Sequence, residues 1–87
     1  MFVVLVYDVN ASKDARISKI CKPYLLHIQN SVFMGDITLG NLRILLDKLK
    51  GEIDRESEVL DIFILRSRKT VRRITIGESR VRHENVI

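Results

Sequence analysis

The sequence has few of the residues from which covalent cross-links, zinc clusters and phosphate-binding loops are built. Its single cysteine, Cys21, excludes an internal disulfide and a cysteine-based zinc cluster. The four glycines do not form a phosphate-cradling loop. His27 and His83 lack the spacing of metal ligands, and Ser31 lacks a nucleophile-elbow pattern. These absences argue against covalent catalysis and fit a reduced, cytoplasmic protein.

Long apolar runs and signal-peptide features are also absent. The apolar stretch at residues 2–7 has no positively charged region before it and is far shorter than the roughly 20 residues that span a bilayer. We therefore expect no membrane association. The apolar fraction of 46% and the charged fraction of 30% predict one globular domain over residues 1–87. A chain this short buries only about 60–65% of its unfolded surface, so association with a second copy is expected.

The surplus positive charge lies near the C-terminus. Residues 66–82 hold seven basic side chains and one acid, whereas the rest of the chain holds eight basic and ten acidic residues. Such a run is either a solvated face or a phosphate-binding surface, because guanidinium groups bind phosphate through paired donors. The seven basic residues are Arg66, Arg68, Lys69, Arg72, Arg73, Arg80 and Arg82.

The first half of the chain predicts a strand, a helix and a second strand region. Residues 2–7 form a central strand that is apolar on both faces. Ser12 is the expected N-cap of a helix over residues 13–22, which ends or kinks near Lys22 because Pro23 interferes with its last turn. Residues 28–37 are either one bent strand or two short paired strands, and the sequence leaves both open.

The second half predicts a helix and two further strands. Thr38 is the expected cap of a helix whose apolar stripe repeats at helical spacing up to Ile53. Residues 60–64 form a third strand, residues 72–76 alternate like an edge strand, and residues 78–87 add a last strand or arm. The order predicts an α+β fold, a ferredoxin-like βαββαβ unit with both helices on one face of an antiparallel sheet and an additional C-terminal strand.

Asp8 is the main candidate for a functional acidic residue. It ends the first predicted strand, and acids are scarce in strands, whereas sites in open α/β sheets gather at strand ends. The residues alone allow a helix-capping or solvated role as well as a metal-binding one. One aspartate is a poor Mg²⁺ site, since the cation takes several oxygen ligands. Two copies of Asp8 facing each other across a dimer axis would form a better one.

Two segments resemble a known family. They are Tyr7-Asp8-Val9, which closes the first strand, and Gln-Asn-Ser-Val-Phe-Met-Gly at residues 29–35. Both are similar to segments of the small CRISPR-associated spacer-acquisition protein, the second of the two adaptation proteins, which is often labelled an endoribonuclease. The similarity extends along most of the chain, including the second predicted helix and residues 74–77.

The resemblance implies a ferredoxin-like homodimer whose C-terminal strand packs on the partner's sheet. It also implies that one Mg²⁺ binds between the two Asp8 side chains, with Tyr7 beside Asp8. Ser31 and Phe33 match the motif near the dimer cleft, and Arg16 falls near the family's basic residue on the first helix. Nucleic-acid contacts are then expected from Arg16 and from the basic residues at 66–82.

Several functions remain open at this point. The first is a Mg²⁺-dependent endonuclease that cleaves RNA or duplex DNA with Asp8 as its catalytic metal ligand. The second, also implied by the resemblance, is a non-catalytic DNA-binding scaffold that bridges CRISPR integrase dimers during spacer acquisition. A toxin-type ribonuclease of the same fold is a third. A generic RNA-recognition domain is disfavoured, because three phenylalanines and two tyrosines are few for base stacking.

Overall fold

The computed structural model describes residues 1–66, 69, 72 and 74–77, which include a four-stranded antiparallel sheet. The strand order is β2-β3-β1-β4, so β1 (Phe2–Asp8) is paired on both sides. Its neighbours are β3 (Val32–Asp36) and β4 (Val59–Leu65), and β2 (Leu26–Gln29) forms one edge. This central position explains the continuous apolar run, because both faces and both edges of β1 are covered at least in part.

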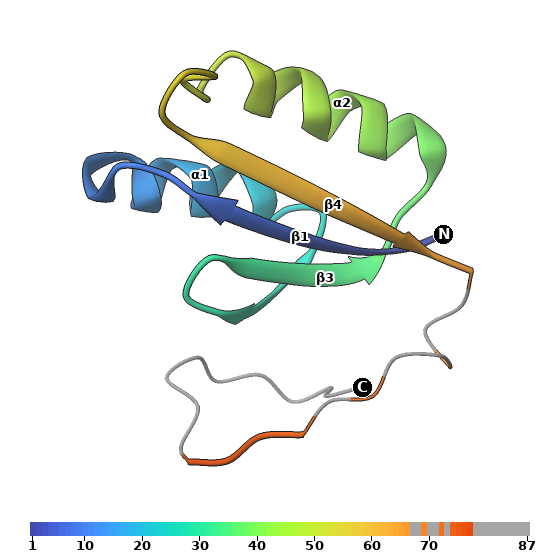
Figure 1. Cartoon of the computed structure of the whole chain (residues 1–87). Helices are drawn as coiled ribbons and strands as arrows, with labels where there is room; N and C mark the ends of the chain where they lie inside the picture. Colours follow the sequence, from blue (N-terminus) through green and yellow to red (C-terminus); the bar gives the residue numbers. More distant parts are fainter. Residues whose placement is uncertain (67–68, 70–71, 73, 78–87) are drawn as a thin grey trace.

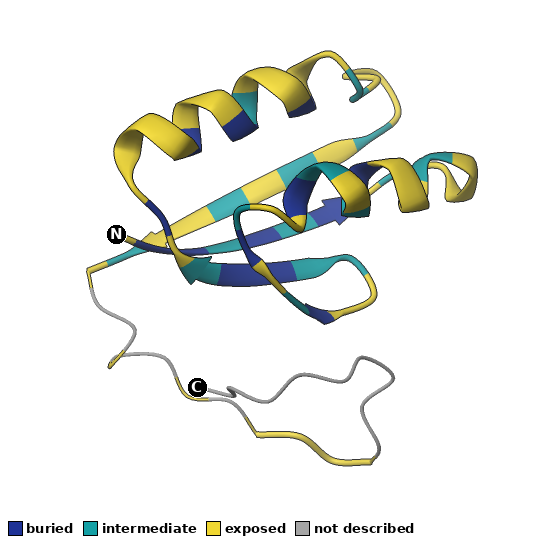
Figure 2. Ribbon diagram, turned by 180° about the vertical axis from the view of Figure 1, so that it is seen from behind, coloured by how far each residue is buried: buried dark blue, intermediate teal, exposed yellow. Residues whose placement is uncertain are grey.

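Two α-helices of the described part cover one face of this sheet. They are α1 (Asp14–Cys21), preceded by the short 3₁₀ turn η1 (Ala11–Lys13), and α2 (Leu39–Lys50). Figure 1 shows both helices on the same side of the sheet, and Figure 2 shows their buried residues turned toward it. The element order and the sheet order together confirm the ferredoxin-like α+β fold.

The main core lies between the sheet and the helices. Odd-numbered residues of β1 point into it, because side chains of a strand alternate between its two faces. The helices contribute residues at helical spacing, so the apolar stripe of α2 is confirmed as core. The fully buried side chains of this core are Val3, Leu5, Ile17, Cys21, Phe33, Leu45 and Leu49.

The opposite face of the sheet carries no helix from the described residues (Figure 1). Even-numbered residues of β1 point to it, and Phe2 packs there with Ile28 and Met34 in a smaller apolar cluster. On β4 the same face bears Phe63, which pairs with Val4 in the sheet register and is 56% exposed. We call this surface the open face. It bears several apolar side chains together with the exposed Asp61, which pairs with Val6, and the described residues leave much of it uncovered.

The start of α1 differs from the prediction. Ser12 does not cap α1: the N-cap of α1 is Lys13, which makes no side-chain capping hydrogen bond, and Asn10 caps the η1 turn, where its side-chain oxygen accepts a hydrogen bond from the Ser12 backbone N–H at 3.0 Å. The chain then makes the η1 turn before α1 begins at Asp14. The helix ends at Cys21 with Lys22 as its C-cap, which confirms the predicted end. Residues 28–37 resolve into two paired strands joined by a turn at Asn30, whose φ is 37°.

The C-terminal part also needs a correction. The alternating pattern at residues 72–76 predicts an edge strand, but Arg72 and residues 74–76 belong to no strand in the structure. Ile74 and Ile76 are exposed, so the alternating pattern finds no sheet to pair with among the described residues of this one chain. The predicted arm at residues 78–87 lies outside the described residues. Within the described part, no helix is long and apolar enough to span a membrane.

The prediction that Thr38 caps α2 is confirmed. Its side-chain oxygen accepts a hydrogen bond from the Asn41 backbone N–H at 3.1 Å. Thr38→Ala leaves that N–H without its partner and should lower the free energy of unfolding by about 1 kcal/mol. Urea denaturation measures the change, with Thr38→Ser as the control because it keeps the hydroxyl. Equal stability of the Ala and Ser variants would contradict the assignment.

Candidate functional site

Asp8 lies at the last position of β1, on the open face. It pairs with Val59, the first residue of β4, and its side chain is exposed. On the other side of β1, pairing with β3 stops at Val6, and the last contact there is a hydrogen bond from the Tyr7 N–H to the Ser31 carbonyl at 3.1 Å. Within the described chain, Asp8 therefore has a strand partner on the β4 side only.

Asp8 has too few acidic neighbours to hold a metal ion within the described part of one subunit. Among residues 1–66, 69, 72 and 74–77, no three His, Cys, Asp or Glu side chains come together as a metal site. Asp8 does border a polar depression of about 420 Å³, whose other side is formed by Asp54, Ser57 and Glu58 of the loop before β4. The donor set of one chain fits half of a Mg²⁺ site, which usually needs further oxygen ligands.

Tyr7 and Phe33 lie on the other side of the sheet from Asp8. Phe33 is fully buried in the main core, with the His27 ring stacked on it at 4.4 Å between centroids and the Tyr7 ring at 6.3 Å. Both side chains are therefore turned into the core and away from Asp8 in the single chain, and their place near a dimer cleft stays a prediction. Burial raises the pKa of the Tyr7 hydroxyl, and the nearby Asp14 carboxylate raises it further. Tyr7 therefore stays neutral and is unsuited to act as a general base.

Arg16 and Ser31 are both accessible near this end of the sheet. Arg16 is exposed on α1, and its Nε pairs with the Glu52 carboxylate at 2.7 Å. Ser31 is half-buried in the turn between β2 and β3, where its backbone carbonyl, rather than its hydroxyl, holds the end of β1. The structure thus places Arg16 as a cation on α1 and gives Ser31 a backbone role.

Glu58 is a residue that sequence reasoning does not single out. Its carboxylate accepts hydrogen bonds from the Asn10 N–H at 2.8 Å, the Asp54 N–H at 2.9 Å and the Lys13 ammonium at 2.7 Å. Its side chain is only 5% exposed. We call these three interactions the Glu58 cluster. They join the β1–α1 loop to the α2–β4 loop behind Asp8.

The Glu58 carboxylate is held in its ionised form. The hydrogen bond from Lys13, followed by those from the backbone N–H groups of Asn10 and Asp54, lowers its pKa from 4.5 to about 2. The Lys13 ammonium also donates to the Glu52 carbonyl at 2.9 Å, so the same loop is held at two points. No sequence signal distinguishes Glu58 from Glu56, because its partners are set by the fold.

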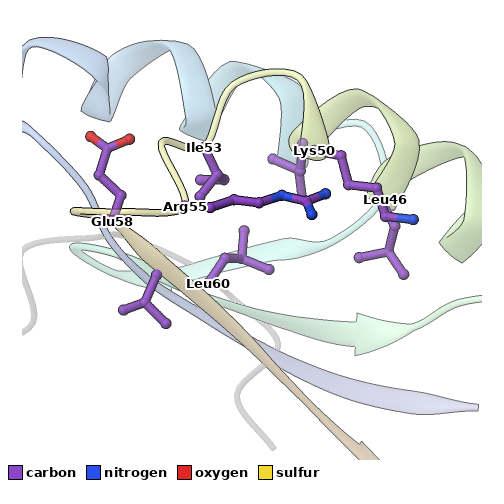
Figure 3. A pocket seen from close by; sticks show the side chains of 8 residues that line it. Leu46, Lys50, Ile53, Arg55, Glu58 and Leu60 are labelled. Atoms are coloured by element: carbon purple, nitrogen blue, oxygen red, sulfur yellow. The ribbon is translucent and has the colours of Figure 1, made fainter.

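A separate apolar groove lies between α2 and β4 (Figure 3). Its cavity volume is about 340 Å³, and the Arg55 side chain extends between Ile53 and Leu60. In the same view the Glu58 side chain points in a different direction from Arg55. Asp8 does not line this groove. The lining residues are Leu46, Leu49, Lys50, Ile53, Arg55, Glu58, Val59 and Leu60.

The basic segment is described only in part. Arg66, Lys69 and Arg72 are exposed, and the Arg72 guanidinium donates to the Lys69 carbonyl at 3.1 Å. The remaining predicted nucleic-acid contacts lie outside the described residues; these are Arg68, Arg73, Arg80 and Arg82. The described part therefore presents three cations to solvent directly after β4 or shortly beyond it.

These features define a small ferredoxin-like domain with one carboxylate at the open end of its central strand and a basic segment after its last strand. A family model described as CRISPR associated protein Cas2 matches residues 1–73, and the chain belongs to this family. It is 34% identical over 77 residues to the CRISPR-associated endoribonuclease Cas2 of Thermotoga maritima, covering 88% of both chains. It is 30% identical over 87 residues to the protein of that name from Dictyoglomus turgidum, covering 100% of each.

A solved structure supports the same assignment. Compared with a crystal structure of Cas2, this chain has a TM-score of 0.85 and 32% sequence identity. The match covers 100% of this chain and 98% of that one. The agreement includes the sheet and both helices, so the expected fold and family are confirmed together.

The stability that the Glu58 cluster contributes should depend on pH. Because the pKa of Glu58 is about 2 in the folded protein and 4.5 ordinarily, this contribution is complete above pH 4.5 and is lost as the pH falls through about 2. Glu58→Gln removes the ionisation. The difference in unfolding free energy between wild type and Glu58→Gln, measured in urea, should be largest at neutral pH and shrink in acid. Glu56→Gln controls for loss of one charge from the same loop. A difference that stays constant from pH 7 to pH 2 would contradict the assignment.

Proposed function

We propose that the protein is a metal-dependent endonuclease of CRISPR adaptation that acts on RNA or duplex DNA as a homodimer. The observation that carries this proposal is the position of Asp8. Its carboxylate lies on the open face of the sheet, at the end of the central strand, with uncovered apolar side chains on the same face. The relatives' printed name, endoribonuclease, supports the same activity.

A second copy is the proposed partner of the open face. Phe63 and Val59 are about half exposed on β4, and Ile74 and Ile76 are almost fully exposed beyond it. A monomer rarely leaves that much apolar surface uncovered in one region. If the two copies meet through this face around a two-fold axis, their Asp8 side chains approach each other, and one Mg²⁺ gains two carboxylates.

Asp8 is the residue proposed to hold the Mg²⁺, with one carboxylate from each subunit. The bound metal would supply a polarised phosphate and an activated water. The cations after β4 would bind the flanking phosphates and position the chain being cut. Tyr7 takes no part in proton transfer, because burial raises the pKa of its hydroxyl and keeps it neutral.

The test of the proposed activity is removal of the Asp8 carboxylate. Asp8→Asn should abolish Mg²⁺-dependent cleavage of RNA or duplex DNA while leaving the fold intact, and chelation of Mg²⁺ should do the same to the wild type. Cleavage is measured on labelled substrates, and folding by circular dichroism. Asp36→Asn is the matched control, since Asp36 is an exposed acid on the same sheet that pairs with Phe2 at the far end of β1. Cleavage that survives in Asp8→Asn would overturn the proposal.

The second candidate function is a non-catalytic scaffold that binds DNA and bridges integrase dimers. The basic segment favours it, because exposed cations bind phosphate with or without a metal. In this case Asp8→Asn should leave DNA binding and assembly with the integrase unchanged. The two candidates share the dimer and differ in whether Asp8 is needed.

The contribution of the basic segment has its own test. Arg66→Glu combined with Arg72→Glu should weaken DNA binding and make its salt dependence shallower, by about 1 in the log–log slope for each phosphate that the variant no longer binds. Fluorescence anisotropy at several salt concentrations measures both. The control is Arg43→Glu combined with Lys50→Glu, which makes the same charge change on exposed residues of α2. Equal effects of the two double variants would show that only net charge matters.

A further inference from the structure

At Asp8, β1 is paired with only one neighbouring strand among the described residues. Its pairing partner is Val59 on β4, whereas the pairing of β1 with β3 has already ended at Val6. Strand ends open more readily than strand centres when they have few hydrogen bonds. The position of the Asp8 carboxylate therefore depends on how firmly the start of β4 and the segment after Asp8 are held together.

Glu58 makes this connection. It directly precedes Val59, the partner of Asp8, and its Oε2 accepts from the N–H of Asn10, two residues after Asp8, at 2.8 Å. Its Oε1 accepts from the Asp54 N–H at 2.9 Å and from the Lys13 ammonium at 2.7 Å. One side chain thus holds both the segment that follows Asp8 and the strand that pairs with it.

The chemistry of the cluster requires a carboxylate. Three donors converge on Glu58, and one of them is a cation. A glutamine has one acceptor oxygen, and its NH₂ group would face either the Asn10 N–H or the pair formed by the Asp54 N–H and the Lys13 ammonium. Donor would then oppose donor in a place that is only 5% exposed. A substitution that barely changes the size of the side chain therefore breaks part of the cluster.

We propose that Glu58 is a positioning residue for Asp8, and that it fixes the strand end from which the carboxylate binds a divalent cation. The proposal rests on the proposed metal-binding role of Asp8. Outer residues that orient a metal ligand typically change metal affinity or activity by 10–100-fold when they are replaced. Glu58 borders the same depression as Asp8, but both of its carboxylate oxygens already accept hydrogen bonds from the Asn10 N–H, the Asp54 N–H and the Lys13 ammonium. It therefore acts through the strand end and not as a ligand, and its removal should weaken metal binding without abolishing the chemistry.

The experiment compares full-length wild type with Glu58→Gln and with Glu56→Gln, the matched control in the same loop. Cleavage rates are measured over a range of Mg²⁺ concentrations at pH 7. For Glu58→Gln, the Mg²⁺ concentration at half-maximal rate should rise on the order of tenfold, and saturating Mg²⁺ should restore most of the rate. A purely structural defect would instead lower the maximal rate in proportion to the folded fraction and leave the Mg²⁺ dependence unchanged. That second result would overturn the proposal.

Amide hydrogen exchange provides a readout that needs no metal. Exchange at residues 8–10 should be faster in Glu58→Gln than in wild type and in Glu56→Gln, while exchange in the centre of β1 is unchanged. If wild type shows no Mg²⁺-dependent cleavage but exchange at residues 8–10 is faster in Glu58→Gln, the proposed activity fails and the positioning role stands. Unchanged exchange in a folded Glu58→Gln protein would overturn the positioning role whatever the activity.

A second variant tests the proposal independently in case Glu58→Gln does not fold. Lys13→Met removes the charged donor and leaves the two backbone hydrogen bonds to Glu58 in place. Lys13→Met should raise the Mg²⁺ concentration at half-maximal rate and speed exchange at residues 8–10, each by a smaller factor than Glu58→Gln does. A Lys13→Met protein that is folded and matches wild type in both measurements would also count against the proposal.

Discussion

The alternation of side chains along β1 is the constraint on which the rest of this structure depends. β1 is hydrogen-bonded to β3 and β4, so its register is set on both sides. The helices bury its odd-numbered residues, and Asp8 is therefore directed to the open face. A slip of one residue would place the odd-numbered side chains on the open face and turn the carboxylate toward the core, where an unpaired charge is costly.

The two faces of the sheet consequently serve different purposes. The helical side contains the main core, and the stack of His27, Phe33 and Tyr7 belongs to that side. The open side carries Asp8 and the exposed Val59 and Phe63 of β4. Lys13 and Glu58 connect the loops at the end of β1, so an ion pair that joins two loops also lies beside the strand end at which the metal site is proposed.

Elements with a local cause could be predicted from the sequence. The strand at residues 2–7 follows from its apolar run. The stripe of α2 and its cap at Thr38 follow from spacing and from one hydroxyl within reach of a nearby N–H. The predicted start of α1 is wrong, because Asn10 caps the η1 turn and α1 begins only at Asp14. The Asn10 N–H is bound by the distant Glu58, a contact that the local sequence does not reveal.

The sequence by itself determined the order of the strands and α-helices up to β4, the family and the place of Asp8 at a strand end, because each depends on contiguous residues. Only the tertiary structure decided that Phe33 belongs to the core, that Asp8 emerges on the open face and that Glu58 holds the chain beside it. Asn10 and Glu58 are 48 residues apart. Their contact exists only because β4 pairs with β1, and long-range strand pairing leaves no mark in either local segment.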